Sequence, residues 1–346
     1  MQAAAGSARG VLGAVASLLE AARSGRSEAP WSRGLACGGG RTGGRQGALE
    51  QGGGEMAWGA QGVRWAACEQ RPATISSDDI PDGWGQTVCV TGAGGYIASW
   101  LVKALLMNGY NVRGSVRDPE DKKKNGHLKG LEGAEERLTL YKADVMDFES
   151  LRSAFDGCRG VFHVASPDKI KVAVEGTKNV MNAAADVGVR RVVFTSSIGA
   201  VHMNPYRSPD AVLDEGCWSD LQYCARTKNW YCYGKTLAEI MAMDVAKKRG
   251  LDLLVVVPPP TVGPMLQASM ATSNFRVLAY ITGKKKTYPN EVMSLVDVRD
   301  IAQAQLLVYE NPKASGRYFC IQSVIHKDEF AAMLAHMFPE YTINAK

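Results

Sequence analysis

The 346-residue sequence lacks any apolar run near the roughly 20 residues that a membrane-spanning helix needs. Its eight cysteines are scattered, without the paired short spacings of a zinc site or the density of a secreted disulfide scaffold. The net charge is only +5, which suits an anionic ligand. The sequence lacks the clustered basic residues of a nucleic-acid surface. We therefore expect a soluble protein with reduced thiols, no metal site, and neither a membrane nor a nucleic acid as partner.

Residues 1–85 are poor in aromatic and β-branched residues and contain glycine runs at 38–40, 43–44 and 52–54. Such a composition cannot offset the entropy lost on ordering, so we expect a disordered N-terminal extension. A short amphipathic helix at 11–22, flanked by arginines, keeps a targeting role open as an alternative. A non-functional extension or an incorrectly assigned start site are the other interpretations.

From Gln86 onward, apolar runs of strand length alternate with segments of helical periodicity, the pattern of a parallel sheet with covering helices. The sequence predicts an α/β fold: a Rossmann-type doubly wound parallel sheet with a smaller C-terminal substrate lobe. The expected division is 86–257 for the dinucleotide-binding domain and 258–346 for the lobe, to which an insertion at 204–222 also contributes. The predicted strands are 87–91, 111–116, 138–142, 160–164, 191–195 and 253–257, and the predicted helices include 97–107, 172–185 and 231–248.

The run VCVTGAGGYIA at 88–98 combines an apolar strand, a glycine-rich turn and the start of a helix. Gly92 permits the tight turn, Gly95 lets the backbone approach a pyrophosphate, and the small Ala98 lets the helix pack on the strand. The helix N-terminus, at Tyr96 and Ile97, then faces the phosphates. This motif predicts a dinucleotide site.

The second predicted strand ends in Arg117, followed by Lys122–Lys124, where an NAD site usually carries an acid for the ribose. The guanidinium of Arg117 and the ammonium of Lys123 suit a 2′-phosphate, which favours NADP(H). The alternative is that Asp118 binds the ribose while Arg117 is solvated. Further candidate cofactor contacts, after the third and fourth strands, are Asp144, Val145 and Ala165; for Asp144 a capping or surface role is the alternative.

Tyr231 and Lys235 lie four residues apart at the start of a long predicted helix, and therefore on one face of it. The ammonium can lower the pKa of the phenol and bind the nicotinamide ribose, which makes Tyr231 a usable proton donor. Upstream, the strand at 191–195 runs into Ser196 and Ser197 at the carboxyl edge of the sheet. We predict Ser197, Tyr231 and Lys235 as catalytic residues, with Ser196 as the competitor for the serine role.

Four segments carry a family resemblance: TGAGGYIA at 91–98, FTSSIGAV at 194–201, CWSD at 217–220 and above all NWYCYGK at 229–235. From about Thr87 to Tyr341 the chain resembles the plant cinnamoyl-CoA reductase family of extended short-chain dehydrogenases/reductases. The heptapeptide distinguishes it from the similar dihydroflavonol reductases. The resemblance implies NADPH-dependent reduction of hydroxycinnamoyl-CoA thioesters to aldehydes, in the cytosol, for lignin or defence phenolics. It also implies that Arg117 and Lys123 hold the 2′-phosphate and that Pro258 lies near the nicotinamide.

Reductases of the family that handle coenzyme A have a His and, three residues later, a Lys before Tyr280, together with an Arg in the ASGRY stretch. Here these positions read Arg276, Ala279 and Arg317, so Arg276 and Arg317 are the candidate substrate residues. The loop after Pro167 is shorter than the family's, and relatives continue beyond Lys346 with a tail that completes the substrate lobe.

Several alternatives stay open at this point. The chain could reduce a smaller phenolic ketone or aldehyde instead, or be a catalytically weak NADP-binding protein. Cys224 precedes the family heptapeptide and Cys232 lies within it, and two free thiols are favoured over a redox switch. The oligomeric state is open, with a monomer favoured.

Overall fold

The computed structural model describes Gly83 and residues 85–167, 169–208, 211–283 and 287–343. The predicted disorder of residues 1–85 and the alternative targeting helix at 11–22 lie outside these ranges, apart from Gly83 and Gly85. Among the helices that are described, none is long and apolar enough to cross a membrane.

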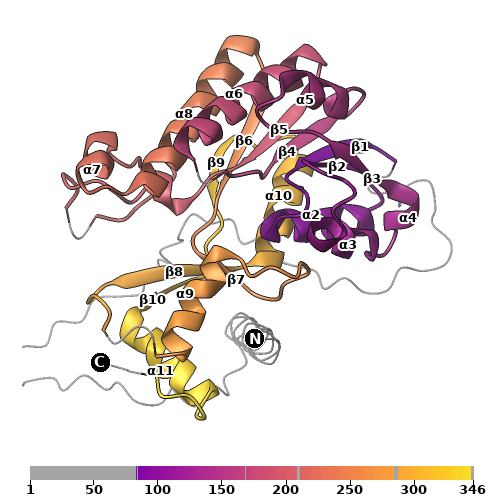
Figure 1. Cartoon of the computed structure of the whole chain (residues 1–346). Helices are drawn as coiled ribbons and strands as arrows, with labels where there is room; N and C mark the ends of the chain where they lie inside the picture. The colour runs from indigo at the N-terminus through magenta and orange to yellow at the C-terminus, as the bar shows by residue number, and fades with distance from the viewer. Residues whose placement is uncertain (1–82, 84, 168, 209–210, 284–286, 344–346) are drawn as a thin grey trace, which may run out of the picture. The chain divides into compact units, whose positions relative to one another are not determined.

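Seven parallel strands form the main sheet, in the spatial order β3-β2-β1-β4-β5-β6-β9 (Figure 1). The order reverses direction between β1 and β4, and a doubly wound sheet opens its ligand crevice beyond the carboxyl ends of the strands at this point. The strands are β1 (Thr87–Thr91), β2 (Asn111–Val116), β3 (Leu138–Lys142), β4 (Gly160–His163), β5 (Arg191–Thr195), β6 (Asp252–Val257) and β9 (Gly316–Phe319).

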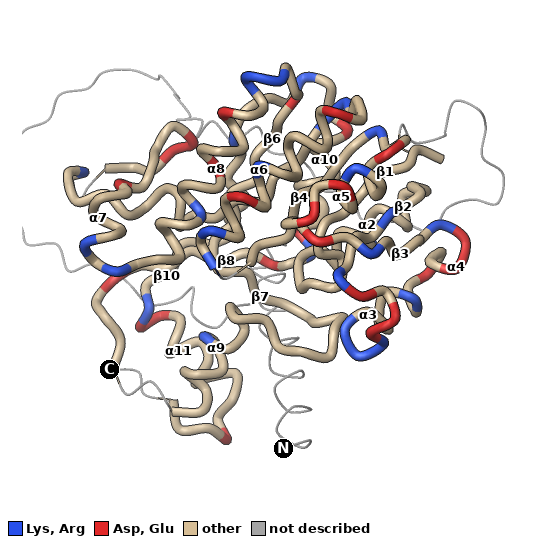
Figure 2. Tube along the Cα trace, turned by 45° about the horizontal axis from the view of Figure 1, so that its top comes forward, with Lys and Arg blue, Asp and Glu red and all other residues tan. Residues whose placement is uncertain are grey.

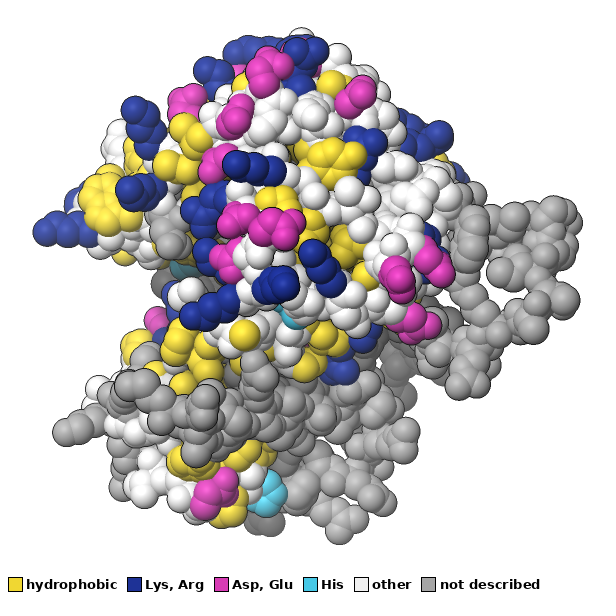
Figure 3. Space-filling view, turned by 45° about the vertical axis from the view of Figure 1, so that its right-hand side comes forward, with side chains coloured by type: hydrophobic (Ala, Val, Ile, Leu, Met, Phe, Trp, Pro, Cys, Tyr) yellow, Lys and Arg dark blue, Asp and Glu magenta, His cyan; other side chains and the backbone are white. Residues whose placement is uncertain are grey.

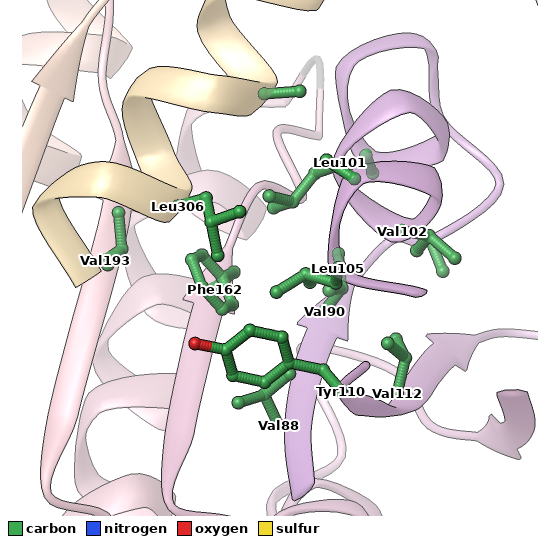
Figure 4. Packing of buried hydrophobic residues seen from close by; sticks show 14 of the residues in the cluster. Val88, Val90, Leu101, Val102, Leu105, Tyr110, Val112, Phe162, Val193 and Leu306 are labelled. Carbon is green, nitrogen blue, oxygen red and sulfur yellow. The ribbon is translucent and has the colours of Figure 1, made fainter. Parts of the chain in front are cut away.

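Two helical layers cover the two faces of this sheet, and β1 shows how the sequence feeds both. Val88 and Val90 point into one hydrophobic cluster and Cys89 into the other, because successive strand side chains alternate between faces. Figure 4 shows the first cluster, where Leu105 and Leu306 from two helices meet the strand residues. The first layer contains α2 (Tyr96–Met107) and α10 (Val298–Glu310), and the second contains α5 (Phe148–Phe155), α6 (Ile170–Asp186) and α8 (Trp230–Arg249).

A second, three-stranded sheet lies in the C-terminal part of the chain. Its strand β8 (Val292–Asp297) pairs antiparallel with β10 (Ser323–His326) and parallel with β7 (Thr261–Val262). Helices α9 (Thr272–Ile281) and α11 (Lys327–Met337) supply the buried Val277, Phe330 and Leu334 to its separate core. These elements form the C-terminal lobe, which the sequence predicts as the substrate side.

Short helices complete the description. They are α3 (Lys122–Lys129), α4 (Ala134–Arg137), the 3₁₀ helix η2 (Ile198–Ala200) and α7 (Leu221–Arg226). On the face seen in Figure 3, acidic and basic side chains are interspersed over the described surface.

The predicted α/β fold is confirmed, and the six predicted strands agree with the structure to within one residue at each end. A seventh strand, β9, was not predicted: it pairs with β6, with Leu254 opposite Gly316. Helix α10, also beyond the predicted boundary at 257/258, packs on α2 in the first layer. The division at 258 stays a prediction, but residues 298–319 return to the main sheet and its helices.

Candidate active site

The glycine-rich loop after β1 leaves little room for side chains, because other parts of the chain approach its backbone closely. Gly92 has φ +65°, and a Cβ there would lie 3.2 Å from the Cα of Ala165. At Gly94 a Cβ would lie 2.7 Å from the side-chain oxygen of Asn125. Gly95 caps α2 without any side-chain hydrogen bond, so no side chain occupies the positive end of the helix. The loop therefore fits a diphosphate, as the motif predicts.

At the start of α2, the side chain of Tyr96 points away from this loop. Its hydroxyl donates to the carbonyl of Gly263 at 2.9 Å, and Trp100 donates to the carbonyl of Pro264 at 2.9 Å. Only the backbone of Tyr96 and Ile97 is thus placed for a phosphate. The side-chain links from α2 to the segment after β7 were not predicted, because no local pattern marks them.

Two cations stand beyond the carboxyl end of β2 without partners among the described residues. Arg117 and Lys123 are exposed, and neither side chain makes a hydrogen bond or ion pair with the described residues. Lys124, in contrast, pairs with Asp121 at 3.1 Å, and a carboxylate oxygen of Asp118 accepts the backbone N–H of Glu120 at 3.0 Å. Figure 2 shows the basic residues at α3. This arrangement favours the 2′-phosphate interpretation over a ribose contact by Asp118.

The candidate cofactor contacts after β3, Asp144 and Val145, make local hydrogen bonds. An oxygen of Asp144 accepts the N–H of Met146 at 2.9 Å, so one carboxylate oxygen is already hydrogen-bonded within the local turn. The carbonyl of Val145 accepts the side-chain amide of Asn179 in α6 at 3.0 Å. Val145 is consequently fixed against the second helical layer, whereas a cofactor contact by Asp144 stays a prediction.

A buried network not found from the sequence connects the glycine loop with β4. The Thr91 hydroxyl oxygen accepts the backbone N–H groups of Val164 and Ala165, each at 3.1 Å, so its own proton is directed to Nδ1 of His163 at 2.9 Å. Nε2 of His163 lies 3.1 Å from the hydroxyl of Thr177. Burial, with a smaller contribution from the charge of Lys235, lowers the pKa of His163 to about 3. The Thr91 hydroxyl therefore ties Ala165 to the end of β1, and the neutral ring of His163 orients that hydroxyl.

The structure brings the three predicted catalytic residues together at the carboxyl edge of β5. The Tyr231 hydroxyl donates to the Ser197 hydroxyl oxygen at 3.1 Å. Asn229 caps α8 by accepting the N–H of Cys232 at 3.2 Å, which places Tyr231 in the first turn. One turn later, the ammonium of Lys235 donates to the carbonyl of Thr195 at 3.0 Å.

The electrostatics of this group differ in one respect from expectation. Desolvation of the hydroxyl raises the pKa of Tyr231, although the residue is 58% exposed, and the bond with Ser197 opposes that effect only in part. The pKa of Tyr231 is thus raised and not lowered as expected from Lys235, whose ammonium donates to the carbonyl of Thr195. Burial lowers the pKa of Lys235 itself to about 8, against the opposing charge of Glu239.

The two neighbouring serines have different partners. Ser196 is buried and its hydroxyl donates to the carboxylate of Glu239, away from Tyr231. Ser197 faces Tyr231, and its hydroxyl oxygen also accepts the N–H of Gly199 at 3.1 Å. The geometry favours Ser197 for the serine role.

The two candidate substrate arginines are not brought together. Arg276 is exposed on α9, and its charge has a small lowering effect on the pKa of Tyr231, which is raised on balance by desolvation. The side chain of Arg317 is 6% exposed and its Nε donates to Glu239 at 2.6 Å. Arg317 therefore contacts protein groups in the structure, and a substrate contact by Arg276 stays a prediction.

The remaining candidates lie close by. Pro258 is buried directly after β6, and its carbonyl accepts the N–H of Ile198 beside Ser197 at 2.9 Å. Cys224 and Cys232 are buried free thiols, as favoured from the sequence. Burial raises the pKa of both and brings that of Cys232 to about 11, so the thiols are protonated near neutral pH.

Comparison with known proteins gives three kinds of match. The model of the NAD dependent epimerase/dehydratase family matches residues 88–321. Cinnamoyl-CoA reductase 1 of Oryza sativa subsp. japonica is 61% identical over 279 residues, covering 79% of this chain and 82% of the rice protein.

Solved structures agree with the fold. Vestitone reductase from alfalfa (Medicago sativa) superimposes with a TM-score of 0.67 at 34% identity, covering 74% of this chain and 83% of that one. The NADPH complex of Gre2 from Candida albicans gives a TM-score of 0.64 at 27% identity, covering 74% and 83%. The family match at 88–321 spans Ser197, Tyr231 and Lys235 at the carboxyl edge of the main sheet.

Proposed function

We propose a function from one premise: this chain belongs to the NAD-dependent epimerase/dehydratase family and, within it, to the plant cinnamoyl-CoA reductase family. The function is NADPH-dependent reduction of a hydroxycinnamoyl-CoA thioester to the hydroxycinnamaldehyde, in phenylpropanoid metabolism. The family resemblance supports a cytoplasmic location.

The observation that carries the proposal is the hydrogen bond from Tyr231 to Ser197, with Lys235 one helical turn away. Ser197 and Tyr231 are fixed by β5 and α8, so their hydroxyls converge on one point at the carboxyl edge of the sheet. A carbonyl oxygen that accepts from both is polarised and oriented there.

The cofactor, when bound, supplies a hydride to the carbonyl carbon. Tyr231 gives its proton to, or hydrogen-bonds, the carbonyl oxygen, while Ser197 orients that oxygen. With a thioester, the product of this addition is a hemithioacetal. Its collapse breaks the carbon–sulfur bond and releases the free thiol of coenzyme A and the aldehyde.

NADP(H) is favoured over NAD(H) because Arg117 and Lys123 have no protein partner among the described residues. A guanidinium and an ammonium without protein partners can each bind a 2′-phosphate by charge-assisted hydrogen bonds. Lys235, with its ammonium near the end of β5, is placed to bind the nicotinamide ribose.

A second candidate function is reduction of a smaller phenolic ketone or aldehyde. The observation in its favour is the pair Arg276 and Ala279, which stand where family members that handle coenzyme A have His and Lys. The side chain of Ala279 offers no phosphate contact. A catalytically weak NADP-binding protein is the third candidate.

One assay separates these functions. The full chain is mixed with NADPH, and NADPH consumption is followed with feruloyl-CoA, p-coumaroyl-CoA, coniferaldehyde and dihydroquercetin. We expect turnover of the two thioesters with release of free thiol, which a thiol reagent quantifies. Turnover of coniferaldehyde or dihydroquercetin alone would support the second function, and NADPH binding without any turnover the third.

A further inference from the structure

A fully buried carboxylate lies behind the catalytic group. Glu239 is one helical turn beyond Lys235 on α8 and is 0% exposed. Its two oxygens have different partners: one accepts the hydroxyl of Ser196, and the other accepts Nε–H of Arg317 at 2.6 Å. Burying an ion costs on the order of several kcal/mol of desolvation free energy unless the ion is well paired. The roles given above to Ser197, Tyr231 and Lys235 leave this ion pair without a function.

Arg317 is itself held in place from several directions. Its Nη1 donates to the carbonyls of Glu215 at 2.6 Å and of Cys217 at 2.8 Å. Its guanidinium lies 4.0 Å from the ring centre of Trp218. Strand β9, helix α8 and the segment before α7 therefore meet at this one side chain, and Glu239 is fixed by a rigid partner.

The groups around Lys235 make Glu239 its sole acidic neighbour of consequence among the described residues. On α8 itself, the charge of Glu239 acts on the pKa of Lys235. From β4, His163 is neutral, and from β5 the Thr195 carbonyl and the Phe194 ring face the ammonium. From β9, Arg317 is turned to Glu239.

We propose that Glu239 is a positioning residue, clamped by Arg317, that keeps Lys235 in its ammonium form and fixes Ser196 at the end of β5. The carboxylate acts through these neighbours and touches neither substrate nor cofactor. This proposal deepens the function proposed above and rests on it for kinetic readouts, whereas the charge state of Lys235 can be measured without any substrate.

The physical reason lies in the balance of two effects. Burial disfavours the ammonium and brings the pKa of Lys235 to about 8, while Glu239 opposes this shift. Loss of the negative charge would leave both burial and the cation of Arg317 acting against protonation. Lys235 would then be largely neutral near pH 7.5, and a neutral amine binds a ribose hydroxyl less well.

The experiment compares the titration of Lys235 in the cofactor-free protein, followed by NMR of ¹³Cε-labelled lysine, with Lys235→Arg used to assign its signal. In Glu239→Gln we expect the midpoint to fall by about one pH unit, the usual effect of losing a nearby opposite charge. If an active substrate is found, the alkaline limb of turnover should move by the same amount. In Ser196→Ala, the matched control that removes one hydrogen bond and keeps the charge, the midpoint should not move.

Thermal unfolding shows whether each variant is folded. Should Glu239→Gln unfold, Glu239→Gln/Arg317→Met carries the test, since replacing both members of a buried pair by neutral groups is often tolerated. Its midpoint should fall by about half as much, because the nearer charge dominates. A Lys235 titration midpoint in the folded variant that lies within about 0.2 pH unit of the parent midpoint would overturn the proposal. Absence of turnover with every thioester would sink the proposed function but leave this titration unchanged.

Discussion

The main sheet and the C-terminal lobe differ in how tightly they are packed, and the main sheet with its helices is called the rigid part below. In the main sheet, every residue of β5 is buried, and two large hydrophobic clusters cover the faces. The lobe has three short strands and one smaller core, and Val292 and Val324 on its strands are more than 60% exposed. Ser197, Tyr231 and Lys235 come from elements of the rigid part, and Arg276 from the lobe. We therefore expect the main sheet and its helices to position the chemistry, and the lobe that carries Arg276 to influence the choice of substrate.

The strongest test of this comparison is Tyr231→Phe. Turnover should fall about 10²–10⁴-fold, the usual contribution of a positioned acid or base. NADPH affinity should be unchanged, because the phosphates are held at the glycine loop and at Arg117. Single-turnover reduction and fluorescence titration with NADPH measure the two effects. A variant with a rate within about threefold of the parent rate would refute the assignment of Tyr231 as the proton donor.

Matched cavities in the two cores sharpen the comparison. Leu105→Ala in the first layer and Leu334→Ala in the lobe each remove a fully buried side chain, at a cost of about 2–5 kcal/mol in unfolding free energy. Leu105→Ala should also weaken NADPH binding, whereas Leu334→Ala should raise KM for the substrate and leave NADPH affinity intact. Denaturant unfolding and the two affinities are the measurements. Equal loss of NADPH affinity in both variants would show that the two parts are not separable.

Cofactor choice belongs to the rigid part and gives the next effect in size. Arg117→Asp should remove charge-assisted contacts worth about 1.5–3 kcal/mol and so reduce or reverse the preference for NADPH over NADH. Lys124→Ala is the control, since Lys124 is already paired with Asp121. The dissociation constants of both cofactors decide the matter. Equal affinities in the unmodified protein would contradict the role of Arg117.

The His163 network predicts the smallest effect, a loss of stability in acid. The pKa of His163 is about 3 in the folded protein and near 6.5 when unfolded, so the unfolded chain binds the extra proton between these values. The contribution is therefore complete above pH 6.5 and is lost as the pH falls towards 3. At pH 5 the stability lost in this way amounts to about 2 kcal/mol.

The control for this prediction is His163→Gln, which keeps an acceptor for Thr91 and a donor for Thr177 but does not titrate. Unfolding free energies at pH 7 and pH 5 are compared for both proteins. We expect the parent to lose about 2 kcal/mol more than the variant between these two values. An identical loss would show that His163 is not the acid-sensitive group.

The sequence predicted the strands well because each is an apolar run bounded by Gly, Asn or charged residues. It missed β9, since GRYF is four residues long and only partly buried, so no apolar run marks it. Tyr231 and Lys235 could be found from their helical spacing. The choice of Ser197 over Ser196 needed the structure, because both follow the same strand and only their hydrogen-bond partners differ.

His163 and Glu239 were not found, since a single His at the end of a strand and a single Glu on a helix have no local pattern. Their roles depend on contacts with residues 72 and 78 positions away, Thr91 and Arg317 respectively. Arg317 was expected at the substrate because of its place in the ASGRY stretch, and the register of β9 beside β6 is what brings it into the sheet.

The return of the chain to the main sheet at α10 and β9 governs how this protein can be recombined. The lobe is not a terminal module, because its strands β7 and β8 precede α10 while β10 and α11 follow β9. A single crossover at residue 258 would exchange Leu306 and the whole of β9 along with the lobe, and so would mismatch the core against α2. A chimera with a different substrate lobe needs two separate grafts, at 258–297 and at 321–343, with 298–320 retained from the parent.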